Sequence, residues 1–143
     1  MTTPTEWMKD EYNDLVSKGF DWKPPVITGA SSARCIIDGS EKIMLCANNY
    51  LNLSTHPKIR QAAKDAVDTH GAGSGSVRPI AGNMDIHNQL EESIARFKNR
   101  EAALYYQTGF AVNSGLIPQL AGKNDAIISD QLNHGSIIDG VRL

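Results

Sequence analysis

The stretch IISDQLNHGS, residues 127–136, is the strongest indication of how this chain folds. Residues 126–128 form a short apolar run of the kind that makes a buried strand. The run breaks into a polar turn that carries His134, and a new apolar pattern begins at Ile137. A histidine just beyond the carboxyl end of a strand lies where open α/β sheets bind ligands. A histidine that caps a surface turn is the alternative, and this stretch alone does not separate the two.

The elements before this stretch alternate between helix and strand. Apolar residues recur at helical spacing in two segments, and short apolar runs predict buried strands between and after them. Alternation of this kind predicts an α/β fold with a parallel sheet and right-handed crossovers. The predicted order is helix 85–99, strand 102–106, helix 109–122, strand 126–129 and a helix from about 134.

The turn at Thr108-Gly109 joins a predicted strand directly to a predicted helix. Such a turn leaves free N–H groups at the positive end of the helix dipole, which is an arrangement that binds anions. An ordinary connection that needs glycine only for the turn is the alternative. Because this turn and His134 both follow carboxyl ends of strands, we expect one crevice with an anion cradle and an imidazole. The polar turn at Asn48-Asn49 could lie near it, although simple Asx-turn chemistry also explains that pair.

The N-terminal half predicts an amphipathic helix, an extended linker, a hairpin and a second helix. Thr5 can cap the first helix, Gly19 and Gly71 can end the two helices, and Asp-Gly is a strong hairpin signal. The predicted elements are a helix from Glu6, the linker Trp22–Pro25, strands 33–37 and 42–46 around the turn Asp38-Gly39, and a helix from Pro57.

Composition and charge narrow the class of protein. With 143 residues, 41% apolar and 21% charged, the chain predicts one globular domain. A net charge of −2 gives no electrostatic reason to expect nucleic acid or an acidic membrane as a partner. The four histidines lack metal-ligand spacing, no apolar run could span a membrane, and no signal peptide is evident. Cys35 and Cys46 could oxidise across the hairpin, but reduced buried cysteines in a cytoplasmic protein are the favoured interpretation.

The glycine-rich stretch 71–79 does not match a nucleotide-binding loop. It contains neither GxxxxGK[ST] nor GxGxxG, and it follows a predicted helix, whereas the dinucleotide fingerprint follows a strand. A loop that carries Arg78 towards a site or a subunit interface is the better interpretation.

Five ordered motifs together resemble the α-oxoamine synthases, which are pyridoxal-phosphate (PLP) enzymes of the aspartate-aminotransferase type, fold type I. The resemblance runs from about Val26 to Leu143. It implies that residues 1–55 form an N-terminal arm, linker and hairpin, and that residues 56–143 form the first part of the PLP-binding domain. The motifs are CANNYL (46–51), GAGSGSVR (71–78), IAG (80–82), TGFAVN (108–113) and SDQLNHGSIIDG (129–140).

The resemblance also implies roles for single residues. His134 is expected to stack on the pyridine ring of PLP, and Gly109 and Phe110, beside Thr108, to hold its phosphate. Asn48 is similar to an amide that helps to hold the substrate carboxylate, and Arg78 to an arginine at the mouth of the site. Asn52 replaces the usual glycine after Tyr-Leu, and asparagine tolerates a positive φ better than most residues.

The activity implied by the resemblance is transfer of an acyl group from coenzyme A to an amino acid. The motifs look most similar to those of glycine C-acetyltransferases, which make 2-amino-3-oxobutyrate from glycine and acetyl-CoA, and next to those of 8-amino-7-oxononanoate synthases. The family's Schiff-base lysine, pyridine-pairing aspartate and carboxylate-binding arginine are expected to lie outside this chain. We therefore expect the chain alone to be inactive and the complete enzyme to be a homodimer. A second chain that supplies the rest, or a non-catalytic partner role, are the alternatives.

Overall fold

The computed structural model describes residues 3–143 and divides the chain into two compact units. The first unit ends at Gly73, and the second runs from Ser74 to Leu143. This division lies within the glycine-rich stretch, whereas the predicted boundary at 55/56 concerns the domains of a complete enzyme and stays a prediction.

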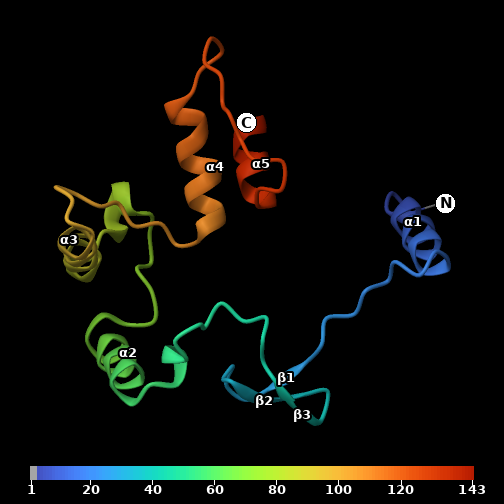
Figure 1. Ribbon diagram of the computed structural model, residues 1–143, viewed down its shortest axis with the longest axis horizontal. Coiled ribbons are helices and arrows are strands. Elements are labelled where there is room, and N and C mark those ends of the chain that lie inside the picture. The colour runs from blue at the N-terminus through green and yellow to red at the C-terminus, as the bar shows by residue number, and fades with distance from the viewer. Residues whose placement is uncertain (1–2) are drawn as a thin grey trace. The chain divides into compact units, whose positions relative to one another are not determined.

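The first unit contains the predicted helices and hairpin, joined by extended chain (Figure 1). Helix α1 ends where Gly19 takes a φ of 73°, and helix α2 begins with Pro57 as its first helical residue. The predicted positive φ at Asn52 is confirmed, since its φ and ψ are 52° and 35°. The elements are α1 (Glu6–Ser17), β1 (Ile27–Thr28), β2 (Arg34–Ile37), β3 (Ser40–Ile43), a single turn Leu53–Thr55 and α2 (Pro57–His70).

The hairpin turns on Asp38 and Gly39, whose φ angles are 48° and 77°. Two residues with positive φ are typical of the type I′ turn that joins antiparallel strands. Because the turn has only two residues, Ile37 pairs directly with Ser40, and β3 begins at Ser40 instead of the predicted 42. The unpredicted strand β1 adds to the other edge of β2, with Ile27 opposite Ile37.

The two cysteines do not face each other across this hairpin. Cys35 pairs with Lys42 in the β2–β3 register. Cys35 is buried, whereas Cys46 is exposed, so the prediction of two buried cysteines is wrong for Cys46. Both thiols are free.

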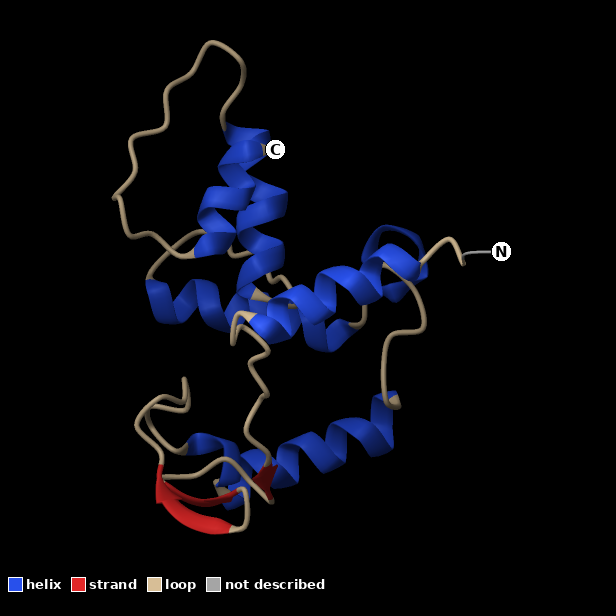
Figure 2. Cartoon of the chain, turned by 90° about the vertical axis from the view of Figure 1, so that its right-hand side faces the viewer, coloured by secondary structure: helices blue, strands red, loops and turns tan. Residues whose placement is uncertain are grey.

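The second unit contains three helices and one irregular turn (Figure 1). Helices α4 and α5 lie side by side in both ribbon views (Figures 1 and 2). The predicted helices are all present, with ends within a few residues of those expected. The elements are a wide turn Arg78–Gly82, α3 (Asp85–Lys98), α4 (Gly109–Leu120) and α5 (Gly135–Arg142).

The predicted parallel sheet is not formed by the described residues. Residues 102–106 and 126–129 are extended, but Figure 2 draws both as loops, and neither pairs with another strand. A parallel strand needs a neighbour to satisfy its backbone groups, and residues 3–143 provide none. As a result Leu104 is 66% exposed and Ile128 is 99% exposed, although both were predicted to be buried.

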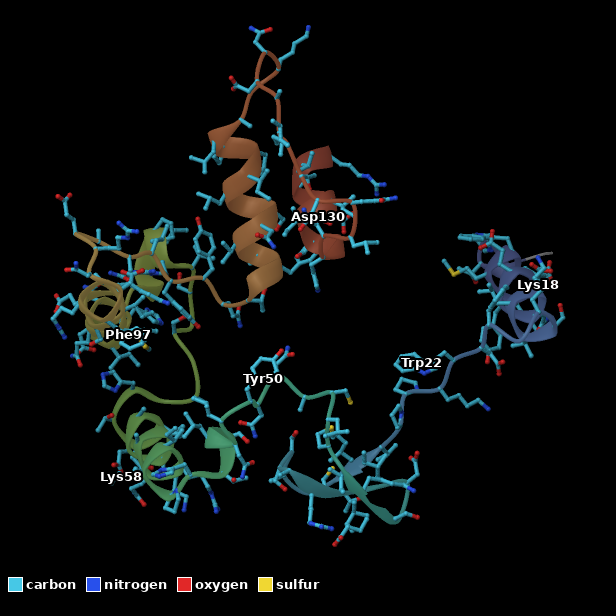
Figure 3. All side chains as sticks on the ribbon, in the orientation of Figure 1. Lys18, Trp22, Tyr50, Lys58, Phe97 and Asp130 are labelled. Atoms are coloured by element: carbon cyan, nitrogen blue, oxygen red, sulfur yellow. The ribbon has the colours of Figure 1, made fainter. Side chains whose placement is uncertain are left out.

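Apolar side chains are exposed along much of the described chain. Figure 3 labels Trp22, Tyr50 and Phe97, which stand out from the ribbon and are 78%, 87% and 83% exposed. Exposed apolar surface on this scale is typical of surfaces that pack against other protein. No helix among residues 3–143 is long and apolar enough to cross a membrane.

Candidate active site

The candidate site lies at the end of the second unit where α4 and α5 both begin. Asn113 lies beside Ser136, and one turn further along both helices Ile117 lies beside Gly140. The two helices therefore run parallel, and their N-termini lie at the same end of the pair. Each N-terminus carries the positive end of a helix dipole.

Helix α4 presents a set of hydrogen-bond donors at this end. Thr108 is its N-cap residue, and the Thr108 Oγ1 accepts a hydrogen bond from the main-chain N–H of Ala111 at 3.1 Å. The Thr108 hydroxyl therefore keeps its own proton available to donate. The N–H groups of Gly109 and Phe110 have no acceptor among the described residues, and no atom approaches the Cα of Gly109 on its open side. These donors form the cradle that could bind an anion at the helix N-terminus, and anion binding there stays a prediction.

His134 is the N-cap residue of α5. The Ser136 main-chain N–H donates to the His134 Nδ1 at 3.1 Å, so the imidazole nitrogen takes the place of the usual side-chain oxygen of an N-cap. A ring nitrogen that accepts an N–H carries no proton of its own, which puts the proton of the neutral ring on Nε2. The ring is exposed, and the described residues provide no partner for Nε2. His134 therefore caps a helix, as one of the two interpretations predicts, and a role for its exposed ring at a ligand site stays a prediction.

A buried serine connects the imidazole to α4. Ser136 is 4% exposed, and the Ser136 Oγ lies 2.7 Å from the His134 Nδ1. The Asn113 side-chain amide donates to that same hydroxyl oxygen at 2.9 Å. The hydrogen bonds thus run from α4 to the serine and on to the ring.

The two asparagines of the first unit have different surroundings. The Asn49 side-chain amide donates to the Ser31 carbonyl at 3.0 Å and to the Ser54 Oγ at 2.7 Å. Asn48 is exposed, and its side chain has no hydrogen bond within residues 3–143. Asn49 therefore has structural hydrogen bonds, which reach Ser31 and Ser54 and do not close an Asx turn, whereas Asn48 has none. The predicted contact of Asn48 with a substrate carboxylate stays a prediction, as does its place in a crevice with His134.

Arg78 forms a two-point ion pair with Glu91 of α3. The guanidinium Nη1 and Nη2 donate to the two carboxylate oxygens at 2.6 Å and 3.0 Å, and the Glu91 side chain is only 15% exposed. The Arg78 hydrogen bond and the main-chain N–H of Tyr105, which donates to Glu91 at 2.8 Å, lower the pKa of Glu91 to about 2. The Glu91 carboxylate in turn raises the pKa of Arg78.

This ion pair also holds the extended segment that leads to the cradle. Glu91 accepts from the Tyr105 N–H, and the Arg78 Nη1 donates to the Tyr105 carbonyl at 3.4 Å. Two side chains thus satisfy the backbone groups that a neighbouring strand would otherwise bind. Glu91 is therefore a largely buried ion-pair partner and not part of a solvated face of α3. A substrate role for Arg78 stays a prediction. In this structure the Arg78 guanidinium is engaged by Glu91.

Sequence reasoning did not identify Glu91, Asn113 or Ser136 as parts of the site. The signal for Ser136 was present, because a serine two residues after an N-cap histidine can reach the ring. No group of three or more histidine, cysteine or acidic side chains that could hold a metal ion occurs within residues 3–143.

The family of this chain follows from its match to a known family model. The family model described as aminotransferase class I and II matches residues 40–143, which include the cradle and His134. The chain belongs to the aminotransferase class I and II family. The match covers the later part of the first unit and all of the second.

The similar curated proteins belong to a narrower group. An 8-amino-7-oxononanoate synthase of Symbiobacterium thermophilum is 50% identical over 139 residues, which is 97% of this chain and 36% of that protein. Another of Treponema denticola is 47% identical over 138 residues, which is 96% of this chain and 35% of that protein. The chain thus spans about a third of the length of these relatives.

Solved structures show the same fold. A serine palmitoyltransferase of Sphingomonas wittichii is 31% identical with a TM-score of 0.80, and the match covers 96% of this chain and 35% of that one. A variant serine palmitoyltransferase of S. paucimobilis, solved with a bound PLP–myriocin aldimine, is 28% identical with a TM-score of 0.81 over the same shares. Both groups of relatives are α-oxoamine synthases, so the resemblance and the fold type predicted from the motifs are confirmed.

Proposed function

We propose that the N-terminal end of the α4–α5 pair binds PLP in a protein that transfers acyl groups from coenzyme A to an amino acid. The observation that carries the proposal is the meeting of two features at one end of two parallel helices. One is the cradle of Thr108, Gly109 and Phe110, and the other is the unengaged Nε2–H of His134. Family membership and the solved relative with bound PLP support it.

The residues present fit the cofactor. A phosphate is an anion with several acceptor oxygens, and the cradle offers two free N–H groups, a hydroxyl and a helix dipole. His134 offers a flat, exposed ring for an aromatic face. When bound, PLP supplies an electron sink for the α-carbon of an amino acid. The residues of this chain would hold and orient it, while the covalent lysine of the family is expected to lie outside this chain.

The amino acid and the acyl group are proposed from the relatives. The similar curated proteins are 8-amino-7-oxononanoate synthases, which favours that activity over the glycine and acetyl-CoA reaction that the motifs first suggested. The product name describes a nine-carbon acid with an amino group on carbon 8 beside a ketone on carbon 7. Separating carbons 7 and 8 gives a seven-carbon dicarboxylic acyl thioester and alanine. The new C–C bond forms at the alanine α-carbon, the thiol leaves, and the alanine carboxylate leaves as CO2.

Phosphate binding by the cradle can be tested separately from ring binding. PLP and pyridoxal, which lacks the phosphate, are titrated into the protein that contains this chain. We expect Thr108→Val and Gly109→Pro to weaken PLP binding by about tenfold to a hundredfold each, the value of one hydrogen bond to a charged group. Pyridoxal binding should be unchanged. Proline is tolerated at the first helical position, and Thr108 already has the extended backbone that a following proline requires. Equal losses for PLP and pyridoxal would contradict the cradle.

The role of the imidazole is tested by two substitutions with different effects on helix α5. His134→Asn removes the ring but keeps a good N-cap, whereas His134→Ala removes both. We expect both variants to bind PLP more weakly and turn over more slowly, but only His134→Ala to lower the melting temperature. An asparagine variant with normal turnover would show that His134 is a cap and nothing more.

The choice of substrate is tested by product analysis. The complete enzyme is given alanine with a seven-carbon dicarboxylic acyl thioester, or glycine with acetyl-CoA. We expect the first pair to react with release of CO2. Faster reaction of glycine with acetyl-CoA, with the glycine carboxylate retained, would favour glycine C-acetyltransferase activity instead.

The proposed partners follow from the exposed apolar surface. Leu104 and Ile128 stand on extended segments without neighbouring strands, which suggests that further protein completes a sheet there. We propose that this protein is the remainder of a longer enzyme that acts as a homodimer, with a second chain as the alternative. A cytoplasmic location is part of the same proposal.

A further inference from the structure

We propose that Ser136 and Asn113 are positioning residues that hold the His134 ring as a neutral Nε2–H donor. The inference rests on the proposed function, because it assigns a task to residues that support His134 at that site. It goes further by naming which ring nitrogen faces the ligand and what fixes it.

The first step is the state of Nδ1. The main-chain N–H of Ser136 can only donate, and it lies 3.1 Å from the His134 Nδ1. The nitrogen must therefore accept, which excludes a proton on Nδ1. The neutral ring then carries its proton on Nε2, which the described residues leave without an acceptor.

The second step is the direction of the serine hydroxyl. The Asn113 side-chain amide donates to the Ser136 Oγ at 2.9 Å, so this oxygen already accepts a hydrogen bond. The hydroxyl proton is then free to be donated to the His134 Nδ1 at 2.7 Å. Ser136 is 4% exposed, so water cannot readily replace either partner. The chain of donors runs in one direction, from α4 to the ring.

The third step is the consequence for a ligand. Because the Ser136 hydroxyl and main-chain N–H both lie against Nδ1, the ring can present only Nε2–H to a ligand. A fixed donor can hydrogen-bond an oxygen of the amino acid or of the acyl group. An imidazole free to exchange its proton between the two nitrogens would offer an acceptor for part of the time. Because Asn113 belongs to α4, the ring is also held in register with the helix that forms the cradle.

The test is 15N NMR of the histidine rings in the protein without added PLP, at mildly alkaline pH. We expect a pyridine-type signal for the His134 Nδ1 and a pyrrole-type signal for Nε2. Ser136→Ala removes the hydroxyl donor, and Asn113→Asp replaces an amide donor with a carboxylate that turns the hydroxyl away from the ring. Both should move the Nδ1 signal downfield, as a lone pair does when it loses a donor. Ser136→Thr, which keeps the hydroxyl, should restore it.

Ser114→Ala is the matched control. Ser114 also lies on α4, but its hydroxyl donates to the Phe110 carbonyl of its own helix at 2.9 Å. We expect no change in the His134 signals for this variant. Should Ser136→Ala fail to fold, Asn113→Asp gives the same reading, since the Asn113 side chain is only partly buried.

Kinetics provide a second readout. In the complete enzyme, Ser136→Ala and Asn113→Asp should lower kcat about threefold to tenfold, the value of one hydrogen bond, with a smaller effect on KM. An Nδ1 signal unchanged in both variants would overturn the inference and leave PLP binding intact. A shifted Nδ1 signal in a protein that does not bind PLP would support the positioning role and overturn the proposed function instead.

Discussion

Gly140 is where α5 comes closest to α4, so Gly140→Ala is a direct test of the helix pair. A Cβ added at Gly140 would collide with the main-chain oxygen of Asn113, and would lie 2.9 Å from its carbonyl carbon and 3.1 Å from the Ile117 Cδ1. Ordinary carbon contacts are roughly 3.5–4.0 Å. The helices would therefore have to separate by about 0.6–1 Å.

The expected loss of stability follows from two opposing effects. Forcing an extra carbon into a packed contact costs about 1–3 kcal/mol, and a rigid backbone neighbour puts Gly140 at the upper end of that range. Alanine in place of glycine inside a helix stabilises the helix by about 1 kcal/mol, which offsets part of this loss. We expect Gly140→Ala to lower the free energy of unfolding by about 2 kcal/mol. The same separation would stretch the hydrogen bond between Asn113 and Ser136, now 2.9 Å, and loosen the support of His134.

The measurement is urea unfolding, with Gly115→Ala as the matched control in α4. A Cβ at Gly115 would meet only the Tyr106 Cε1, at 3.5 Å, which is an ordinary contact. Gly115→Ala should therefore raise stability by up to about 1 kcal/mol. The two variants change the same atoms in neighbouring helices, and we expect opposite signs. If Gly140→Ala stabilised the protein as much as Gly115→Ala does, the close parallel packing would be refuted.

Three further predictions concern single side chains. The pKa of Glu91 is about 2 in the folded protein and roughly 4.3 when unfolded, so Glu91 stabilises above about pH 4.3 and this contribution is lost as the pH falls towards 2. Urea midpoints measured against pH should show this dependence in the wild type and in Glu92→Gln, but not in Glu91→Gln. Asn52→Gly should leave the melting temperature nearly unchanged, whereas Asn52→Ala should lower the free energy of unfolding by about 1 kcal/mol, because its φ is 52°. Asn48→Ala should raise KM for the amino acid without altering the melting temperature, whereas Asn49→Ala should lower the melting temperature.

Local structure followed closely from the sequence because local signals determine it. Pro57 at a helix start, Gly19 after a helix end and the Asp38-Gly39 turn each fix backbone angles without help from distant residues. Asn52 is a similar case, since only a few residue types adopt its left-handed conformation readily. Predictions of this kind were confirmed to within a few residues.

The pairing of strands in a parallel sheet could not be predicted from local sequence in the same way. An apolar run such as residues 102–106 predicts an extended segment, but pairing depends on a second strand that the run does not specify. Within residues 3–143 that partner is absent, and Arg78 and Glu91 take over the backbone groups of Tyr105. Glu91 lies among other charges on α3, so its pattern is that of a solvated face. Only the arrangement in space distinguishes it from Glu92.

The candidate site contains some features that local sequence determines and others that depend on contacts between distant residues. Thr108 and His134 were identifiable because each stands just before a helix, where a side chain can cap. The link from Asn113 to Ser136 joins residues 23 positions apart, on two different helices. No pattern within one helix could indicate it, because it exists only once the two helices lie side by side.

An N-cap histidine is not by itself evidence of a ligand site, and the chain contains the comparison that shows this. The His56 Nδ1 accepts the main-chain N–H of Lys58 at 3.3 Å at the start of α2, just as His134 does at the start of α5. Serine, aspartate or asparagine would cap either helix better. The residue two positions after His56 is Lys58, which has no hydroxyl to reach the ring. The residue two positions after His134 is the buried Ser136, which also accepts a hydrogen bond from Asn113 of α4. The His134 ring therefore has more hydrogen bonds than a helix cap requires. That additional support is what a residue selected for the direction of one N–H would require, and it is the reason to look for the ligand at His134 and not at His56.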